Sequence, residues 1–306
     1  MTLDDLRCLV AVCEAGSFSA AARRLGCSQP AVSQHIQRLE TELGLRLFER
    51  QPRSVVATPA GENLKRAASE SLSLLERAVH RFAALRDGDA GTLVVTTGGT
   101  TVKHFMRPTI KQFRRSFPKV RMQFRGAMSS AECIEMLLRE PVDMAFVTQG
   151  EAIDGITQRP LLELDYVLFT VRDHPLAQRK SLRIGELDGL ECIGLVEGRA
   201  SRDHLSQALA RHGAELATTM TVCDWDTAIH LVELGLGSSI VPSWYAYAAA
   251  SSKATVAVPI VGLPPLRVGW ALRDSYEPLK PARELMRLLK ADLQQRPTPP
   301  GVRVLR

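Results

Sequence analysis

Residues 17–50 read SFSAAARRLGCSQPAVSQHIQRLETELGLRLFER, and this segment decides the fold of the N-terminal part of the chain. Its alanine-rich start predicts a short helix from residue 20 to 25 that Gly26 ends. Ser28 can cap a following helix, and Pro30 then lies in its first turn, where a missing N–H costs little. Two helices joined by a tight turn are typical of a helix-turn-helix motif.

The second helix of this motif has two different faces. Its apolar residues recur at helical spacing and predict a face turned toward a core. Its other face carries neutral hydrogen-bonding groups and a methyl group, with charge at the edge, which suits the base edges of the major groove. The candidate DNA-contacting residues here are Ser28, Gln29, Pro30, Ala31, Ser33, Gln34 and Arg38. From these residues alone, a three-helix subdomain with a solvated polar face remains an equal alternative.

The flanking segments complete the first domain. An apolar stripe from Leu6 to Cys13 predicts a helix before Gly16. Residues 46–58 have a strand-like pattern and predict a two-stranded hairpin. We expect two further DNA contacts there, from Arg50 and Arg53, which can reach phosphates or the minor groove.

A long helix is expected from Pro59 to about residue 86, because no further proline interrupts it. Its seam alternates spacings of four and three residues, which predicts a partner helix rather than packing within one domain. The seam consists of Leu64, Ala68, Ser71, Leu75, Ala78, Phe82 and Leu85.

From Thr92 onward, strand and helix patterns alternate, which predicts parallel sheets covered by helices. The proline-rich tail from Pro297 is expected to be disordered. The formal net charge of +6 over 306 residues fits an anionic partner. No apolar stretch reaches the ~18 residues that a membrane helix needs, and we see no signal peptide, so we expect a cytoplasmic protein without a membrane partner.

The first domain resembles the LysR-type family of transcription regulators. The matching segments are SFSAAARRL (17–25), SQPAVSQHIQRLE (28–40), LGLRLFER (43–50) and TPAG (58–61). Weaker landmarks continue the resemblance, such as LVVTTGGTT at 93–101 and LGLGSSIVP at 234–242. Cys27 departs from the small or polar residue that is more usual at its position.

This resemblance implies a multidomain protein of α and α/β class. It implies a winged helix-turn-helix over 1–58, a linker helix over 59–88 and an effector-binding domain over 89–306. The effector-binding domain would have the two-lobed α/β fold of periplasmic binding proteins. Lobe I would comprise about 91–162 plus 267–295, and lobe II about 163–266.

The resemblance also implies partners. Double-stranded DNA would be read by the second helix of the motif, and the linker helix would pair with its counterpart in a dimer. A homotetramer and contact with RNA polymerase are implied as well.

In such a fold a ligand binds between the lobes, at the carboxyl ends of strands. Polar residues that precede helices there suit an anion, because helix N-termini offer free N–H groups. We therefore expect a carboxylate or another oxyanion as effector, with no other cofactor. The candidate effector residues are Thr100, Thr101, Ser129, Ser130, Thr148, Arg199, Ser201, Arg202, Trp225, Asp226 and Thr227.

Other functions have less support. The chain has no Walker loop, HExxH or GxSxG motif, and its histidines and cysteines form no metal-ligand spacing, so we expect neither an enzyme nor a metal site. A solute-binding protein is a remote alternative. Within the regulator class, thiol redox sensing through Cys192 and Cys223 is the alternative to an effector, although buried structural cysteines are the simpler interpretation.

Overall fold

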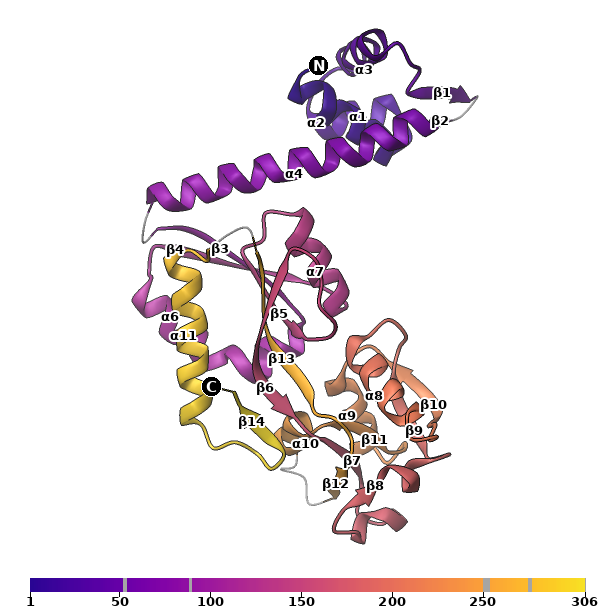
Figure 1. Cartoon of the computed structure of the whole chain (residues 1–306), viewed down its shortest axis with the longest axis vertical. Coiled ribbons are helices and arrows are strands. Elements are labelled where there is room, and N and C mark those ends of the chain that lie inside the picture. The colour runs from indigo at the N-terminus through magenta and orange to yellow at the C-terminus, as the bar shows by residue number, and fades with distance from the viewer. Residues whose placement is uncertain (52–53, 88–89, 250–253, 275–276, 306) are drawn as a thin grey trace. The chain divides into compact units, whose positions relative to one another are not determined.

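The computed structural model describes residues 1–51, 54–87, 90–249, 254–274 and 277–305 (Figure 1). The chain divides into two compact units. One comprises residues 1–82 with 139–141, and the other comprises 83–138 with 142–306. Among the described residues, no helix is both long and apolar enough to cross a membrane.

The first unit is a winged helix-turn-helix. Three helices, α1 (Leu3–Ala15), α2 (Phe18–Leu25) and α3 (Gln29–Leu43), pack around a core that includes Leu9, Val32 and Leu39. Glycines in the left-handed conformation end all three helices, and Ser17 and Ser28 cap α2 and α3. The antiparallel hairpin of β1 (Phe48–Gln51) and β2 (Ser54–Ala57) forms the wing.

Two contacts fasten the wing to the helices. Glu40 on α3 accepts a hydrogen bond from the backbone N–H of Leu47 at 2.7 Å, just before β1. The ring of Phe18 packs edge-on against that of Phe48 on β1, with 5.8 Å between the ring centres. The position of the wing is therefore set by α2 and α3.

The predicted long helix is α4 (Pro59–Asp87). Its first turns bury Ala68 and partly bury Leu64 against the helix-turn-helix core. Farther along, the apolar side chains of Leu75, Val79 and Phe82 are exposed. The seam is thus divided, with its first part packed inside the first unit and its later part solvent-facing in the single chain.

Lobe I of the second unit contains a six-stranded mixed sheet in the order β14-β6-β13-β5-β3-β4. Its strands are β3 (Gly91–Thr97), β4 (Val120–Gly126), β5 (Met144–Thr148), β6 (Ile156–Leu164), β13 (Leu266–Arg273) and β14 (Val302–Val304). Alternate residues of β3 face opposite sides: Val95 joins the core with Phe113 of α6 (Arg107–Ser116), and Val94 packs with Leu137 of α7 (Ser130–Arg139). Helix α11 (Lys280–Gln295) lies beside α6 (Figure 1).

Lobe II is built on the strand order β11-β7-β12-β8, with β9 and β10 as a parallel pair beside it. The strands are β7 (Tyr166–Val171), β8 (Leu182–Arg183), β9 (Glu191–Leu195), β10 (Ala217–Val222), β11 (Ser239–Pro242) and β12 (Thr255–Val261). Its helices are α8 (Ala200–Ala210), α9 (Trp225–Glu233) and α10 (Ser243–Ala249). The backbone N–H of Ile193 on β9 donates to Ser238 O just before β11 at 2.7 Å, which connects the two groups of strands.

The chain crosses between the lobes twice. It leaves the first sheet at the end of β6, Leu164, and enters the second at the start of β7, Tyr166. It returns between Val261 and Leu266.

The expectation of a disordered tail from Pro297 is wrong. Residues 302–304 form β14, which pairs with β6, and the Arg303 guanidinium binds both Glu163 and Asp165. The prolines at 297, 299 and 300 precede the strand, so they remove no hydrogen bond from the ladder. The proline-rich composition of the tail gave no indication of the three-residue strand β14.

Candidate functional sites

The polar face of α3 is presented as the sequence predicts. The side chains of Gln29, Pro30 and Gln34 are exposed, and Ala31 and Ser33 are half-buried beside them. Gln29 Nε2 donates to Ser33 Oγ at 2.9 Å. This bond holds the Gln29 amide on the exposed face, with its oxygen available to accept.

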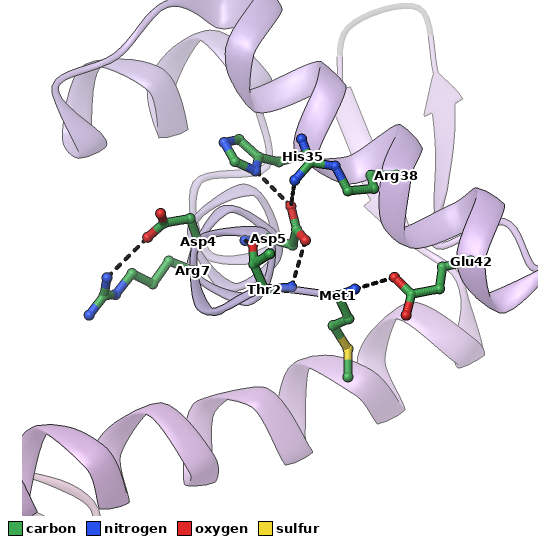
Figure 2. A network of polar contacts seen from close by, with 8 residues as sticks. All are labelled: Met1, Thr2, Asp4, Asp5, Arg7, His35, Arg38 and Glu42. Atoms are coloured by element: carbon green, nitrogen blue, oxygen red, sulfur yellow. Dashed lines mark hydrogen bonds and ion pairs between the residues drawn. The ribbon is translucent and has the colours of Figure 1, made fainter.

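Arg38 differs from its neighbours on α3 because it is tied to α1. Its guanidinium donates to Asp5 Oδ1 at 3.3 Å, and His35 Nδ1 meets the same oxygen at 2.7 Å (Figure 2). The other carboxylate oxygen of Asp5 accepts from the backbone N–H of Thr2 at 2.7 Å, which completes a capping box at the start of α1. About half of the Arg38 side chain remains exposed.

The Asp5 side chain is 0% exposed. Burial alone would raise the pKa of its carboxyl, but the hydrogen bonds from His35 and Thr2 and the charge of Arg38 outweigh it and lower the pKa. Sequence reasoning missed this network. The spacing of Thr2 and Asp5 signals the capping box, whereas nothing in the sequence signals the contact with His35, thirty positions away.

The wing contains the other two candidate DNA contacts, Arg50 and Arg53. The backbone of Arg50 lies in β1, opposite Val55. Arg53 lies outside the described residues. Their DNA contacts therefore stay predictions.

An interlobe cavity of about 110 Å³ lies at the carboxyl ends of β3 and β5 and at the N-termini of α7, α8 and α9. Residues from both lobes line it, and most of the candidate effector residues are among them. Those that line it are Thr100, Thr101, Ser129, Ser130, Thr148, Arg199, Ser201 and Trp225.

The lobe II side of this cavity carries a positive charge. Arg199 is the residue before α8, and α8 starts without a side-chain cap, so its first N–H groups keep their capacity to donate. Among the described residues, the Arg199 guanidinium has no hydrogen-bond or ion-pair partner. On the lobe I side, Ser129 Oγ caps α7 by accepting from the N–H of Glu132 at 3.1 Å. The arrangement can accept an anion between the Arg199 guanidinium and a set of hydroxyl groups.

The structure places Arg202 and Thr227 away from this cavity. Arg202 donates to Leu195 O at 2.8 Å and faces the other side of α8. The backbone N–H of Thr227 donates to Asp224 at 2.9 Å, and its hydroxyl donates to the same carboxylate at 3.1 Å, so Thr227 completes the cap of α9. Both positions precede or begin a helix, and this sequence signal cannot tell which way a side chain points.

Asp226 is also outside the cavity lining, but it joins the two lobes beside it. Its carboxylate accepts from Lys103 Nζ at 2.7 Å and from His104 Nε2 at 2.6 Å. Both partners lie on η1 (Val102–Met106), a π-helical turn of lobe I between α5 (Gly99–Thr101) and α6. Burial alone would raise the pKa of Asp226, but these two hydrogen bonds prevail and lower it.

Arg296, just after α11, shapes this π-helical turn. Its guanidinium donates to His104 O at 3.4 Å and to Phe105 O at 3.0 Å. It also pairs with Asp292. These bonds connect the end of α11 to the π-helical turn.

Sequence reasoning also missed lining residues of the interlobe cavity, including Tyr245 of α10. Tyr245 is buried, which raises the pKa of its hydroxyl. It packs edge-on against His104, with 5.0 Å between the ring centres. Helix α10 is short, so the sequence shows no helical periodicity from which the position of Tyr245 could be predicted.

The geometry of the two cysteines does not favour a disulfide. Cys192 pairs with Thr218 in the β9–β10 ladder, whereas Cys223 follows the other end of β10. Four ladder positions separate them, roughly 13 Å, compared with at most about 7 Å between the Cα atoms of a disulfide. Cys192 is buried, which raises its pKa to about 11 and disfavours the reactive thiolate.

Comparison with known proteins agrees with this architecture. Residues 3–62 match the bacterial regulatory helix-turn-helix domain of the lysR family, and residues 86–294 match the LysR substrate binding domain. The uncharacterized HTH-type transcriptional regulator YnfL of Escherichia coli (strain K12) is 32% identical over 246 residues, which cover 79% of this chain and 82% of YnfL.

Solved structures of full-length proteins are similar as well. CbnR in complex with its target DNA superposes with a TM-score of 0.65 and 26% identity, covering 94% of this chain and 100% of CbnR. An OxyR of Corynebacterium glutamicum gives a TM-score of 0.61 and 26% identity, covering 96% of this chain and 92% of that protein.

A winged helix-turn-helix followed by a long helix and a two-lobed substrate-binding domain defines a DNA-binding transcription regulator. The chain belongs to the LysR family of transcriptional regulators.

Proposed function

We propose that this regulator reads its operator with α3 and is switched by a small oxyanion or short carboxylate bound in the interlobe cavity. The observation that carries the second part is Arg199, a cation at the N-terminus of α8 that has no partner among the described residues. A guanidinium can bind two oxygens of such an anion at once, and free N–H groups of a helix start add to the attraction.

The volume of the interlobe cavity narrows the class of effector. About 110 Å³ holds an inorganic oxyanion or a carboxylate of a few atoms, but not an aromatic acid, unless the lobes separate. Hydroxyl groups of Thr101 and Ser130 line the cavity and provide hydrogen bonds that an anion accepts.

The DNA-binding part rests on the exposed face of α3. Replacing Gln29 by Ala removes an amide that can bind adenine, and we expect a loss of about 1–3 kcal/mol in discrimination between operator and mismatched DNA. Fluorescence anisotropy with both DNAs measures this loss. An equal loss for operator and mismatched DNA would contradict base reading by Gln29.

A dimer through α4 follows from its exposed apolar side chains, Leu75, Val79 and Phe82. In a dimer two copies of α3 can read two halves of an imperfect palindrome. We further propose assembly into a tetramer, contact with RNA polymerase and a cytoplasmic location, as family membership suggests.

The effector part is tested by a thermal-shift panel of inorganic oxyanions and short carboxylates. An anion at 100 times its dissociation constant adds about 2.7 kcal/mol to the free energy of unfolding. The Thr101→Ala, Ser130→Ala double variant should bind the same anion more weakly, and Arg199→Met should weaken it most. Undiminished affinity in all of these variants would exclude the interlobe cavity as the site.

A further inference from the structure

Lobe II contains a second cavity, of about 780 Å³, between α8 and the β9–β10 pair. We propose that this lobe II cavity binds an elongated organic zwitterion, with its carboxylate at Arg202, an apolar middle, and its ammonium at Asp188 and Glu215. The proposal concerns a site separate from the interlobe cavity and does not depend on the proposed effector.

The size of the lobe II cavity suits an organic molecule rather than an ion. Small-molecule sites range over ~300–1,000 Å³, and this cavity falls within that range, whereas the interlobe cavity does not. Space arises partly because several of its residues carry little or no side chain. These are Gly194 on β9, Ala210 on α8, and Gly213 and Ala214 after it.

The middle of the lobe II cavity is apolar. Leu205 and Leu209 of α8, Ile193 of β9 and Trp225 of α9 line it, and each belongs to the buried core. An alkyl or aryl segment placed against these side chains leaves water at a gain of roughly 25 cal/mol per Å² of buried apolar surface.

One end of the cavity is basic. The Arg202 guanidinium is oriented by its hydrogen bond to Leu195 O at 2.8 Å. Its acidic neighbour Glu197 is 3.7 Å away and its side chain is 91% exposed, so this ion pair is weak. A ligand carboxylate can therefore replace Glu197 without breaking a buried contact.

The other end is acidic. Glu215 follows the C-terminus of α8, and its backbone N–H donates to Asp188 Oδ1 at 3.0 Å, which brings two carboxylates to this end. Arg202 lies in the first turn of α8 and Ala210 ends it, a span of about 12 Å along the helix axis. Because the basic end lies at the start of α8 and the acidic end follows its C-terminus, the charges match an elongated molecule whose two ends carry opposite charges.

The lobe II cavity shares walls with the interlobe cavity, because Leu195 and Trp225 line both. A molecule bound in lobe II thus contacts the same indole that borders the interlobe cavity. We therefore expect binding of the zwitterion to change the affinity of the interlobe cavity for an anion, and the reverse by the same factor.

The probe for this site is 8-aminooctanoate, titrated into the full-length protein by calorimetry. Octanoate, which has only the carboxylate, and octylamine, which has only the ammonium group, are the control ligands. Ala210→Phe fills the mouth of the cavity from an exposed position on α8, and Gln207→Phe places the same ring on α8 outside the cavity. Arg202→Met removes the basic end, and Thr101→Ala alters only the interlobe cavity.

We expect saturable binding of 8-aminooctanoate, weaker binding of the two one-ended ligands, and a loss of at least about tenfold in Ala210→Phe and in Arg202→Met. Gln207→Phe and Thr101→Ala should bind as the wild type does. The proposal is overturned if 8-aminooctanoate does not bind saturably or if Ala210→Phe binds it normally. A loss in Thr101→Ala would likewise overturn it, by assigning the probe to the interlobe cavity.

Discussion

Two aspartates of this protein have the same kinds of partner in different surroundings. Asp5 accepts from His35 and Arg38 in the helix-turn-helix, and Asp226 accepts from His104 and Lys103 in the effector domain. The Asp5 side chain is fully buried, whereas that of Asp226 is 26% exposed.

The difference between them indicates different roles. Asp5 connects α1 to α3, the helix that we propose reads DNA, so loss of the Asp5 contacts disturbs a small, closely packed domain. Asp226 connects lobe II to the π-helical turn of lobe I, next to Thr100 and Thr101 of the interlobe cavity. Water reaches the Asp226 carboxylate and the Lys103 ammonium, which lowers the cost of breaking this contact compared with that of Asp5.

The largest effect is expected for Asp5→Asn. The change leaves His35 and Arg38 without a charged acceptor, and we expect the helix-turn-helix to lose about 2–3 kcal/mol of stability. Hydrogen exchange of the α1 and α3 amides in the full-length protein measures this loss. Asp4→Asn is the matched control, because Asp4 is exposed and pairs with Arg7 on the surface, a contact worth less than ~1 kcal/mol. Equal losses in the two variants would contradict a structural role for Asp5.

Acid should weaken the same domain, by less than the substitution does, because protonation removes the charge but not every hydrogen bond. The pKa of Asp5 in the folded protein is below its ordinary value of 3.8. Because the Asp5 carboxyl has a lower pKa in the folded protein than in the unfolded chain, its ionised form stabilises the folded protein at a pH above the unfolded pKa. This stabilisation is lost as the pH falls through the pKa of the folded protein. Guanidinium unfolding between about pH 5 and pH 3 should therefore show a steeper decline in the wild type than in Asp5→Asn. Parallel declines in the two proteins would show that protonation of Asp5 does not cause the loss of stability in acid.

For Asp226→Asn we expect a smaller loss, about 1 kcal/mol, because Asp226 and Lys103 are partly or largely exposed to water. The loss should appear as about fivefold faster opening of the amides in η1 and in the first turns of α9, measured by hydrogen exchange. Asp154→Asn, an exposed change in lobe I, is the control. A loss as large as that of Asp5→Asn would abolish the distinction between the two aspartates.

The smallest effect is expected from the cysteines. We expect peroxide to leave the operator affinity of the wild type unchanged, and likewise that of Cys192→Ala and Cys223→Ala. The two thiols lie at opposite ends of the β9–β10 ladder, and the pKa of Cys192 is about 11. An operator affinity that peroxide changes in the wild type, but not in these variants, would establish the redox alternative.

The sequence predicts the two regions unequally. The helix-turn-helix follows from one continuous segment, because its caps, turn and apolar stripe are all local signals. Polar residues at strand ends, such as Thr101 and Ser130, could be predicted to converge because parallel strands end at one edge of a sheet. Their role in binding an effector stays a prediction.

Contacts between distant segments could not be predicted. The partners of Asp226 lie more than 120 positions away, and the sequence has no signal for such a pair. The sequence gives no clear signal for strand β6 either, because Pro160 and polar neighbours obscure its pattern. The pairing with β13 accommodates Pro160 through a shift of register between Val268 and Gly269.

The proposed coupling between the interlobe cavity and DNA binding is tested most directly by two measurements. One is the operator affinity with and without a saturating anion, and the other is the anion affinity with and without operator. If the interlobe cavity controls DNA reading by α3, both affinities must change, and by the same factor, because the coupling between two binding sites is reciprocal. Substitution of Arg199 should remove that factor and leave the operator affinity of the anion-free protein as it was. An anion that binds while the operator affinity stays constant would contradict the central claim.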